Sequence, residues 1–348
     1  MTSYLTVYDE SAVKALCTTR ANETKAWQSM ALLDTQVNVQ QALIDAAQFG
    51  IRYVLLGICE DIGPRANLGN KGAHQAWPAF LKRFLNQPHN QFIATQKILL
   101  LGEVNTTDLM LQSNPLSAKQ PEQLTQLREL CRQLDERVEA VLSLIFKAGL
   151  EPIVIGGGHN NCLGIIRALS KHSQNPINAI NLDPHADFRP CEGRHSGNGF
   201  TYAYDEQHLN NYHVIGLHEL KNNQATLDAM AQANHSFTSY QAIAVRREIT
   251  LSSAVTHALN NTDNYALGIE VDLDSITYMP VSAYNCSGFS VADAEHFVHL
   301  AASNRRAKYL HLCEAAPSQH PNDLDAGAEH TGQVLSALVN SYLQAKEQ

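Results

Sequence analysis

The feature that most constrains the fold is a series of short apolar segments, each followed by a polar turn and often by a helix-like segment. The apolar segments predict strands at 53–58, 97–101, 151–155, 178–182, 212–217, 236–240, 265–271 and 309–312. Helical spacing of apolar residues predicts helices at 38–49, 76–85, 121–148, 291–302 and 331–345, and one more that ends at 169. Strands that alternate with helices are typical of a parallel sheet covered by helices on both faces.

No internal repeat and no linker-like tract divides the chain, so the sequence predicts a single domain over residues 1–348. The first 45 or so residues are polar and irregular, and we expect them to be an appended segment. Residues 59–77 are rich in Gly and Asn and predict a long loop after a strand.

Charge and cysteine usage exclude several classes of function. Lys and Arg number 25 against 34 Asp and Glu, a net charge of −9, which is unsuited to binding a phosphate backbone. No window approaches the roughly 18 uncharged apolar residues of a membrane helix. Asp9 and Glu10 lie where a signal peptide would be apolar, and the seven cysteines form no C-x-x-C pair. We therefore expect no nucleic-acid or membrane partner, and a cytoplasmic protein with reduced thiols.

The strongest local signal is the run DPHAD after the strand predicted at 178–182. Asp183, His185 and Asp187 alternate, so in an extended segment their side chains leave from one face. An isolated D-x-H-x-D motif also suits a solvated loop with capping aspartates. Three potential metal ligands on one face nevertheless favour a site over a purely structural strand end.

Other predicted strands also end in polar side chains. His159 follows one of them, Glu270, Asp272 and Asp274 end or follow a second, and Glu314 follows a third. Ligands of parallel α/β sheets bind at the carboxyl ends of the strands. Each feature alone is ambiguous, but their occurrence at successive strand ends indicates one shared site.

The donor set predicts the kind of ion. One or two imidazoles with four carboxylates form a hard, oxygen-rich site that favours Mn²⁺ or a similar divalent ion over a thiolate-type zinc site. So many carboxylates would repel one another without cations, and two ions would neutralise them and activate a water molecule between them.

Five motifs in this order, VIGGGHNN, NLDPHADFRP, RHSGNGF, GIEVDLD and HLCEAAP, resemble the motif series of the ureohydrolase superfamily. This superfamily contains arginase, agmatinase and formimidoylglutamase, and the resemblance covers roughly residues 50–345. It implies a three-layer α/β/α sandwich with a mainly parallel sheet and two Mn²⁺ ions at the strand ends. It also implies hydrolysis of a C–N bond in a guanidino or formimino group.

The resemblance implies roles for individual residues. His159 matches the histidine ligand of one manganese, and Asp183 matches a carboxylate that bridges the two ions. His185 matches the histidine ligand of the second ion, and Asp187 matches a further ligand of the first ion. The D-x-D pair of the family falls on Glu270 and Asp272, which we prefer, or alternatively on Asp272 and Asp274. Glu314 matches the carboxylate that holds the cationic amidine of the substrate. The predicted metal ligands are His159, Asp183, His185, Asp187, Glu270 and Asp272.

Three departures from the family pattern narrow the resemblance. Gly158 stands where arginase and agmatinase have Asp, and Phe200 stands where they have a proton-shuttling His. Both changes resemble the formimidoylglutamase branch. The third departure is Glu270 for the usual Asp, which keeps the charge on a side chain one methylene longer.

Substrate residues are predicted around the same loops. Ser196 and Asn198 match the loop that contacts the amino-acid end of the substrate, although these residues taken alone favour a Gly-rich turn with polar side chains. Arg189 could clamp a substrate carboxylate, as could Arg194 and Arg65, or each could form an ion pair within the fold. His195 is a candidate proton donor. Asp187, Glu314 and His195 are thus the predicted catalytic groups.

The leading hypothesis is a formimidoylglutamase-like hydrolase of histidine degradation, which converts N-formimino-L-glutamate and water to L-glutamate and formamide. The alternatives are a hydrolase of arginine, agmatine or another guanidino compound, and a metal-poor, non-catalytic relative. The expected partner is a small amidino acid, and the superfamily commonly forms homo-oligomers.

Overall fold

The computed structural model describes residues 4–34, 37–262 and 264–348. Its strands are β1 (Leu5–Val7), β2 (Ala31–Leu32), β3 (Tyr53–Ile58), β4 (Ile98–Val104), β5 (Glu151–Ile155), β6 (Ile177–Leu182), β7 (Leu209–Leu217), β8 (Ser236–Ser239), β9 (Leu267–Asp272) and β10 (Ala307–Cys313). Its α-helices are α1 (Glu10–Leu16), α2 (Val39–Gln48), α3 (Ile62–Ala66), α4 (Ala76–Phe84), α5 (Thr107–Ser113), α6 (Pro121–Lys147), α7 (Cys162–Ser173), α8 (Gly199–Asp205), α9 (Gln224–Gln232), α10 (Leu251–Asn260), α11 (Val291–Ala302) and α12 (Leu324–Lys346).

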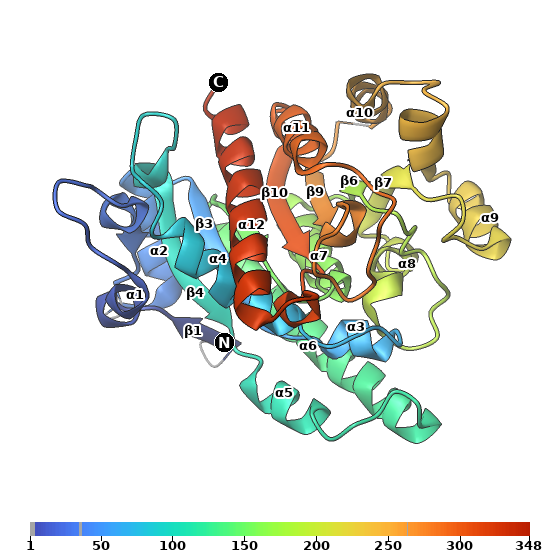
Figure 1. Cartoon of the computed structure of the whole chain (residues 1–348), viewed down its shortest axis with the longest axis horizontal. Coiled ribbons are helices and arrows are strands. Elements are labelled where there is room, and N and C mark those ends of the chain that lie inside the picture. The colour runs from blue at the N-terminus through green and yellow to red at the C-terminus, as the bar shows by residue number, and fades with distance from the viewer. Residues whose placement is uncertain (1–3, 35–36, 263) are drawn as a thin grey trace.

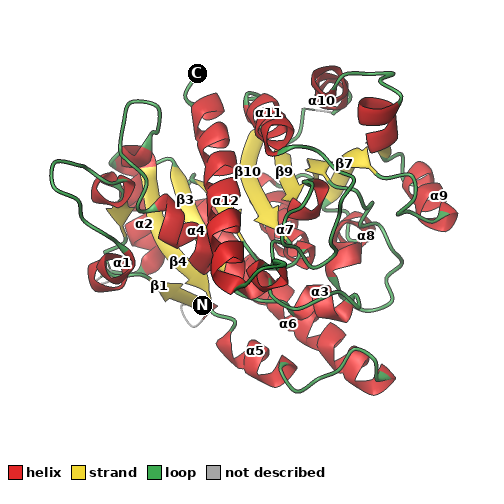
Figure 2. Ribbon diagram, viewed as in Figure 1, coloured by secondary structure: helices red, strands yellow, loops and turns green. Residues whose placement is uncertain are grey.

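These strands of the described chain form one sheet in the order β1-β4-β3-β5-β10-β9-β6-β7-β8, with β2 beside β4. Every pairing is parallel except that of β1 with β4. In Figures 1 and 2, α12, α4 and α11 lie on the near side of the sheet and α6 and α7 on the far side. The predicted three-layer α/β/α sandwich with a mainly parallel sheet is therefore confirmed.

The sheet is buried on both faces, which explains why its strands are apolar throughout. On β3, Val54, Leu56 and Ile58 belong to the core shared with α6 and α7. Tyr53 and Leu55 point the other way, into the core shared with α4, α11 and α12. A strand covered by helices on both sides shows a continuous apolar run rather than alternation.

Local sequence signals set several helix boundaries. Pro121 occupies the first turn of α6, where its missing N–H removes no hydrogen bond. Ser290 and Asp293 form a capping box at the start of α11, and the Asp323 side chain accepts from Ala326 N–H at the start of α12. The observed α11 has the predicted bounds, whereas α12 begins before the predicted residue 331.

Two regions differ from the sequence prediction. The N-terminal segment, predicted to be appended, contributes β1 to the edge of the sheet and places Val13 of α1 in the core. The predicted loop 59–77 contains the short helix α3, in which Ile62 and Ala66 are fully buried. This loop therefore packs against the body of the protein, over the ends of the strands.

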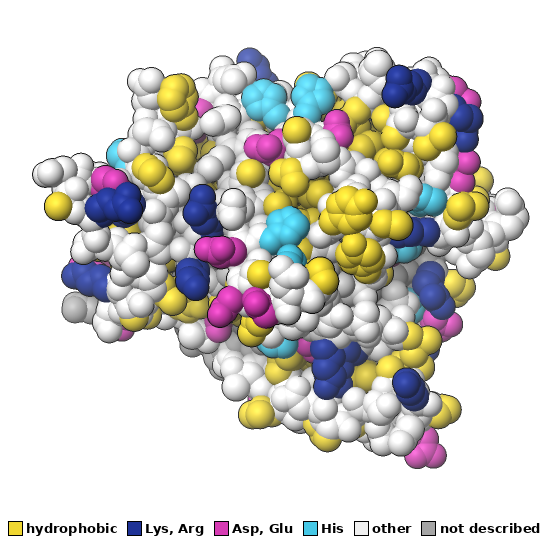
Figure 3. Space-filling view, in the orientation of Figure 1, with side chains coloured by type: hydrophobic (Ala, Val, Ile, Leu, Met, Phe, Trp, Pro, Cys, Tyr) yellow, Lys and Arg dark blue, Asp and Glu magenta, His cyan; other side chains and the backbone are white. Residues whose placement is uncertain are grey.

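Helix hydropathy and the distribution of surface charges describe the outside of the protein. No helix in the described ranges is both long and apolar enough to cross a membrane. Figure 3 shows Lys and Arg side chains as separate groups among acidic and uncharged ones on the face that it presents.

Candidate metal centre

The four central strands end side by side, and each delivers polar residues to the same edge of the sheet. β5, β10, β9 and β6 are parallel neighbours in this order. His159 follows β5, Glu314 follows β10, Asp272 ends β9 and Asp183 follows β6. His159 and Glu314 are 155 residues apart in the sequence, yet His159 N–H donates to Glu314 Oε1 at 2.9 Å.

An inner cluster surrounds the imidazole of His159. Its Nδ1 lies 3.0 Å from Asp187 Oδ2, 3.2 Å from Asp183 Oδ2 and 3.5 Å from Asp272 Oδ2. Nδ1 is buried and makes no hydrogen bond to any of them. A ring nitrogen among three carboxylates, close but without hydrogen-bond geometry, has the arrangement of a ligand set for a cation.

An outer cluster shares one carboxylate with the inner one. His185 Nδ1 lies 3.1 Å from Asp274 Oδ2 and 3.6 Å from Asp183 Oδ1. Asp183 therefore turns one oxygen toward each histidine. Asp274 Oδ1 is buried without a hydrogen-bond partner, which again fits a ligand. The His185 side chain is 30% exposed, so this cluster faces the solvent side of the site.

Crowding raises the pKa of two of the carboxylates. Burial and the neighbouring Asp187 and Asp272 raise the pKa of Asp183 to about 7. Burial and Asp272 also raise the pKa of Asp274 well above its usual range. Carboxylates that resist ionisation when crowded become stable anions once cations lie between them. The residues present therefore fit two hard divalent ions.

Glu270 lies outside both clusters. It points to the same side of β9 as Asp272, but two residues further from the strand end, which is roughly 6.6 Å deeper in the sheet. Its carboxylate accepts from Tyr309 OH at 2.7 Å and pairs with His311 Nδ1 at 2.6 Å. Although burial opposes ionisation, His311 and His159 lower the pKa of Glu270 to about 2.

The preferred sequence register, Glu270 with Asp272, does not match this geometry, whereas the alternative, Asp272 with Asp274, does. Asp272 ends β9 and caps a 3₁₀ turn, η8 (Leu273–Ser275), by accepting from Asp274 N–H at 2.9 Å. The turn brings the Asp274 carboxylate back to His185. The geometry therefore favours Asp274 as the sixth ligand.

We expect Asp274→Ala to lower bound Mn²⁺ from about two ions per chain to about one. The outer cluster loses one of its three donors, while the inner cluster keeps all four. Metal analysis after equilibrium dialysis measures this, with Asp325→Ala, an exposed carboxylate on α12, as the control. Two ions retained by Asp274→Ala would favour the register with Glu270.

Glu314 is held in place at the edge of the site. One of its oxygens accepts from His159 N–H, and the other accepts from the Ser282 hydroxyl. Glu314 has a φ of +64° and Asp187 a φ of +46°, a left-handed backbone that non-glycine residues rarely adopt. Such strain persists where the surrounding contacts dictate the conformation, and it is common at functional sites.

A cavity of about 450 Å³ opens onto the clusters. Asp187, Glu314 and Ser196 line it, and so do the cations Arg189 and Lys221. The Ser196 hydroxyl accepts from Asn67 Nδ2 at 3.3 Å. Carboxylates and positive side chains thus both line the cavity. The further lining residues that belong to the metal clusters are His185, Asp272 and Asp274.

His195 and Asn198 do not line this cavity. Both are fully buried, and their side chains cap the turn that contains Ser196. Burial and three nearby arginines lower the pKa of His195 to about 3, so its ring is neutral near neutral pH and is not an imidazolium acid. These positions argue against the predicted roles of His195 as proton donor and Asn198 as substrate ligand.

Two of the three arginines considered as substrate clamps serve the fold. Arg194 is buried and donates to Asp135, with Nε to Oδ2 at 2.7 Å. Arg65 is buried against Ser113, whose backbone oxygen accepts from Nη2 at 2.7 Å. Arg189 is half exposed and lines the cavity.

Sequence reasoning missed three residues of the site: Lys221, Ser282 and Glu60. Glu60 is fully buried and accepts backbone N–H bonds from Gly158 at 2.7 Å and Ile62 at 2.6 Å. It thereby ties the loop before His159 to the start of α3. Its position just after the strand at 53–58 was the available signal, because Glu60 follows that strand as the metal ligands follow theirs.

Two of the three departures from the family pattern, Gly158 and Phe200, have structural explanations. A Cβ on Gly158 would lie 2.3 Å from Pro64 Cδ, so no larger side chain fits without a shift of α3. Phe200 points inward, edge-on to His159 with ring centroids 5.2 Å apart, and stacks on Tyr212 at 4.1 Å. Phe200 therefore packs against the buried side of a predicted ligand and is absent from the cavity wall.

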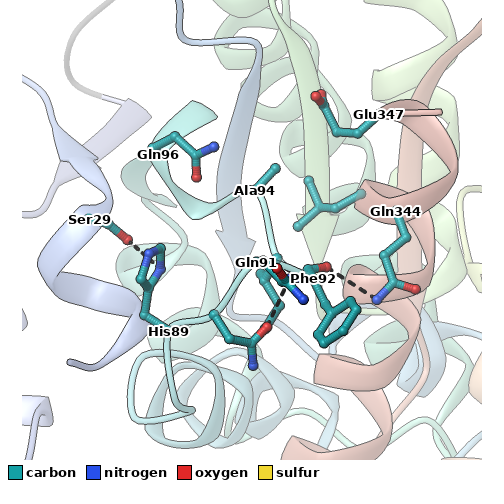
Figure 4. A pocket seen from close by; sticks show the side chains of 11 residues that line it. Ser29, His89, Gln91, Phe92, Ala94, Gln96, Gln344 and Glu347 are labelled. Carbon is teal, nitrogen blue, oxygen red and sulfur yellow. Dashed lines mark hydrogen bonds between the residues drawn. The ribbon is translucent and has the colours of Figure 1, made fainter. Parts of the chain in front are cut away.

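A larger cavity, about 680 Å³, lies at the opposite end of the sheet, before the start of β4 (Figure 4). Several of its polar groups make hydrogen bonds within the protein. Gln344 Nε2 donates to the backbone oxygen of Phe92 at 3.2 Å, and the Ser29 hydroxyl contacts His89 Nδ1 at 3.3 Å. None of the predicted site residues lines it.

The fold and the site together define an α/β sandwich with a set of candidate metal ligands at its strand ends. Residues 52–343 match the sequence model of the Arginase family. The chain belongs to this family, as its motifs predicted.

The curated relatives and solved structures that this chain resembles include several formimidoylglutamases. A formimidoylglutamase of Streptococcus pyogenes serotype M3 (strain ATCC BAA-595 / MGAS315) is 26% identical over 312 residues, 86% of each chain. A Trypanosoma cruzi formiminoglutamase solved with Mn²⁺ has a TM-score of 0.67 at 19% identity, covering 87% of this chain and 98% of that one. The formimidoylglutamase of Bacillus subtilis gives 0.66 at 15% identity, covering 92% and 93%. The structural likenesses confirm the arginase-like fold.

Proposed function

We propose that this protein is a manganese-dependent hydrolase that converts N-formimino-L-glutamate and water to L-glutamate and formamide. The observation that carries the proposal is the make-up of the cavity on the metal clusters. Glu314 and Asp187 lie on its wall with Arg189 and Lys221. A formimino amino acid has one cationic end and two carboxylates, which match these two kinds of side chain. The names of the curated relatives and solved structures support the same substrate.

Two Mn²⁺ ions would be held by an inner and an outer set of residues. The inner set is His159, Asp183, Asp187 and Asp272, and the outer set is Asp183, His185 and Asp274. When bound, the ions supply positive charge and an activated water molecule for attack on the formimino carbon.

The chain's own residues bind and orient the substrate. Glu314 accepts N–H bonds from the amidinium and stabilises its charge as the carbon becomes tetrahedral. Asp187 lines the cavity within the inner cluster, and we assign it the transfer of a proton to the leaving glutamate nitrogen. The C–N bond then breaks, giving the free amine of glutamate and formamide. Ser196, also on the cavity wall, is the remaining predicted substrate contact.

A product assay tests the reaction. Mn²⁺-loaded protein is supplied with N-formimino-L-glutamate, arginine or agmatine, and formamide, ammonia and urea are measured separately. Formamide with an equal amount of glutamate is the expected result. Urea from either guanidino compound would instead support an arginase- or agmatinase-type activity. Tight binding of two Mn²⁺ ions without any product from these substrates would contradict the proposed reaction.

We expect Lys221→Met to raise KM for formiminoglutamate about tenfold with little change in kcat. In the described chain no carboxylate lies within 4.0 Å of the Lys221 ammonium, so it is available to a substrate carboxylate. Arg189→Met should have a smaller effect, because Arg189 is half exposed and already pairs with Glu192 at 3.2 Å. Lys147→Met, at the exposed end of α6, is the control. An unchanged KM in both cavity variants would remove these cations from substrate binding.

The setting of this reaction is part of the proposal. The reaction would belong to histidine degradation, as the family resemblance implies. The scattered, unpaired cysteines support a location in the cytoplasm. Assembly into a homo-oligomer stays a prediction from the family resemblance.

A further inference from the structure

A second polar layer lies beneath the metal ligands. Asn181, Glu270 and His311 each precede a strand-end position by two residues, on β6, β9 and β10. Their strands are paired in register, with Asn181 opposite Glu270 and Glu270 opposite His311. All three side chains are fully buried. Side chains two residues apart on a strand point to the same face of the sheet, so this layer lies on the same face as the ligands and next to them along the strands.

One member of the layer already contacts a predicted ligand. Asn181 Nδ2 donates to Asp183 Oδ2 at 2.9 Å and also contacts Tyr212 OH at 2.9 Å. The layer therefore holds at least one ligand carboxylate in a fixed direction. The charged member, Glu270, is the one that the ligand set leaves unused.

The second ring nitrogen of His159 defines what Glu270 can do. With Nδ1 turned to the inner cluster as a ligand, the neutral ring carries its proton on Nε2. This Nε2 is buried and has no hydrogen-bond partner. Glu270 is the carboxylate of the described residues whose ion pair with the His159 ring is formed through Nε2, with Oε2 at 3.5 Å. A buried N–H without a partner is unfavourable, so a nearby acceptor fixes the ring orientation.

Glu270 is itself locked in place from the other side. Tyr309 OH donates to Oε1 at 2.7 Å and His311 Nδ1 contacts Oε2 at 2.6 Å. Both partners are on β10, the neighbouring strand, and both are fully buried. The carboxylate cannot move toward the clusters without breaking these contacts. Its Oε2 lies 3.5 Å from His159 Nε2, so a small shift of the His159 ring toward this fixed carboxylate would complete a hydrogen bond.

We propose that Glu270 is a positioning residue, which accepts the Nε2 proton of His159 and thereby aims Nδ1 at the inner metal ion. A carboxylate behind a metal-binding histidine raises the basicity of the ligand and fixes its tautomer. The inference rests on the proposed metal centre but not on the identity of the substrate. The E-x-D spacing suggested that Glu270 is a metal ligand. We assign it instead to the layer beneath the ligands, where it orients His159.

The test measures the affinity of each ion in Glu270→Gln, which keeps the shape and removes the charge. Purified chain is titrated with Mn²⁺, free Mn²⁺ is followed by electron paramagnetic resonance, and bound metal is counted after dialysis. Loss of a residue that hydrogen-bonds to a metal ligand typically weakens metal binding about 10- to 100-fold. We expect one ion to weaken by this factor while the affinity of the other stays within about twofold of the wild type.

Two control variants separate positioning from a general structural effect. Asp135→Asn removes another fully buried carboxylate, the partner of Arg194, and should destabilise the fold without changing either Mn²⁺ affinity. Cys313→Ala removes a sulfur that lies near His159 and should also leave both affinities unchanged. Thermal unfolding of the metal-free variants reports the structural effect separately.

The outcomes are distinct. Unchanged Mn²⁺ affinities in Glu270→Gln, or an equal loss at both sites, would overturn the positioning role. The same site-specific loss in Asp135→Asn would overturn it too, because any buried charge would then suffice. A wild type that binds two ions but releases no formamide would refute the proposed reaction and leave the role of Glu270 intact.

Discussion

Asp183→Ala is expected to abolish activity and to reduce bound Mn²⁺ below about one ion per chain. Asp183 Oδ2 lies 3.2 Å from the His159 ring and Oδ1 lies 3.6 Å from the His185 ring. It is the only member common to the two carboxylate clusters of the described residues. Its removal takes a donor from both ions at once, and the remaining carboxylates lose the cations that balance their charge.

Metal analysis after dialysis and a formamide assay measure this effect together. Asp228→Ala, an exposed carboxylate on α9, is the control for the substitution itself. Far-ultraviolet circular dichroism checks that the variant is folded. A folded Asp183→Ala protein that holds two ions and retains full activity would refute the assignment of the site.

Glu314→Gln should lower kcat/KM for the formimino substrate by about 10- to 150-fold while both ions stay bound. The carboxylate of Glu314 would accept a charge-assisted hydrogen bond from the amidinium, worth roughly 1.5–3 kcal/mol. Glutamine keeps the side-chain shape and can still accept from His159 N–H. The change therefore removes the negative charge that faces the substrate and leaves the loop in place.

Steady-state kinetics and metal content are measured on the same preparation. Ser282→Ala serves as a comparison, since it removes the hydroxyl that holds Glu314 but keeps the carboxylate. We expect its loss to be smaller than that of Glu314→Gln. If Glu314→Gln kept both its ions and its kcat/KM, Glu314 would not bind the substrate and the formimino proposal itself would weaken.

The fold could be predicted from the sequence where burial dictates the pattern. The buried strands β3 and β5 have the predicted bounds, and so does α11, whose start is marked by Ser290 and Asp293. β1 could not be predicted, because three residues beside a polar segment carry no periodic signal, and the strand exists only through its pairing with β4. The helix α3 was hidden for a similar reason, since Gly63 and Pro64 inside it favour a loop.

The site shows the same division between local pattern and long-range contact. D-x-H-x-D was readable because its spacing alone places three side chains on one face. The E-x-D-x-D run at 270–274 offered two registers of equal spacing. What separates them is the turn after Asp272 and the contacts of Glu270 with Tyr309 and His311, which come from a strand about 40 residues later.

Hydrogen bonds within one loop explain the remaining differences. His195 and Asn198 lie in a motif that suggests substrate contact, but their side chains close the turn on itself. Gly197 N–H donates to His195 Nδ1 at 3.1 Å, and Asn198 Oδ1 accepts from His195 N–H at 3.1 Å. A sequence does not reveal whether a polar side chain is already occupied by its own backbone.

The convergence of ligands from β5, β9 and β6, with β10 between the first two, also makes metal binding a folding constraint. A strand that slips by one residue turns its side chains to the opposite face, so only the native register brings the donors of all three strands together. Ions that bind this register alone stabilise it by mass action, by about 2.7 kcal/mol per site when free metal exceeds Kd a hundredfold. Ions bound at this site would therefore hold neighbouring strands together, and chelation should loosen the middle of the sheet before its edges.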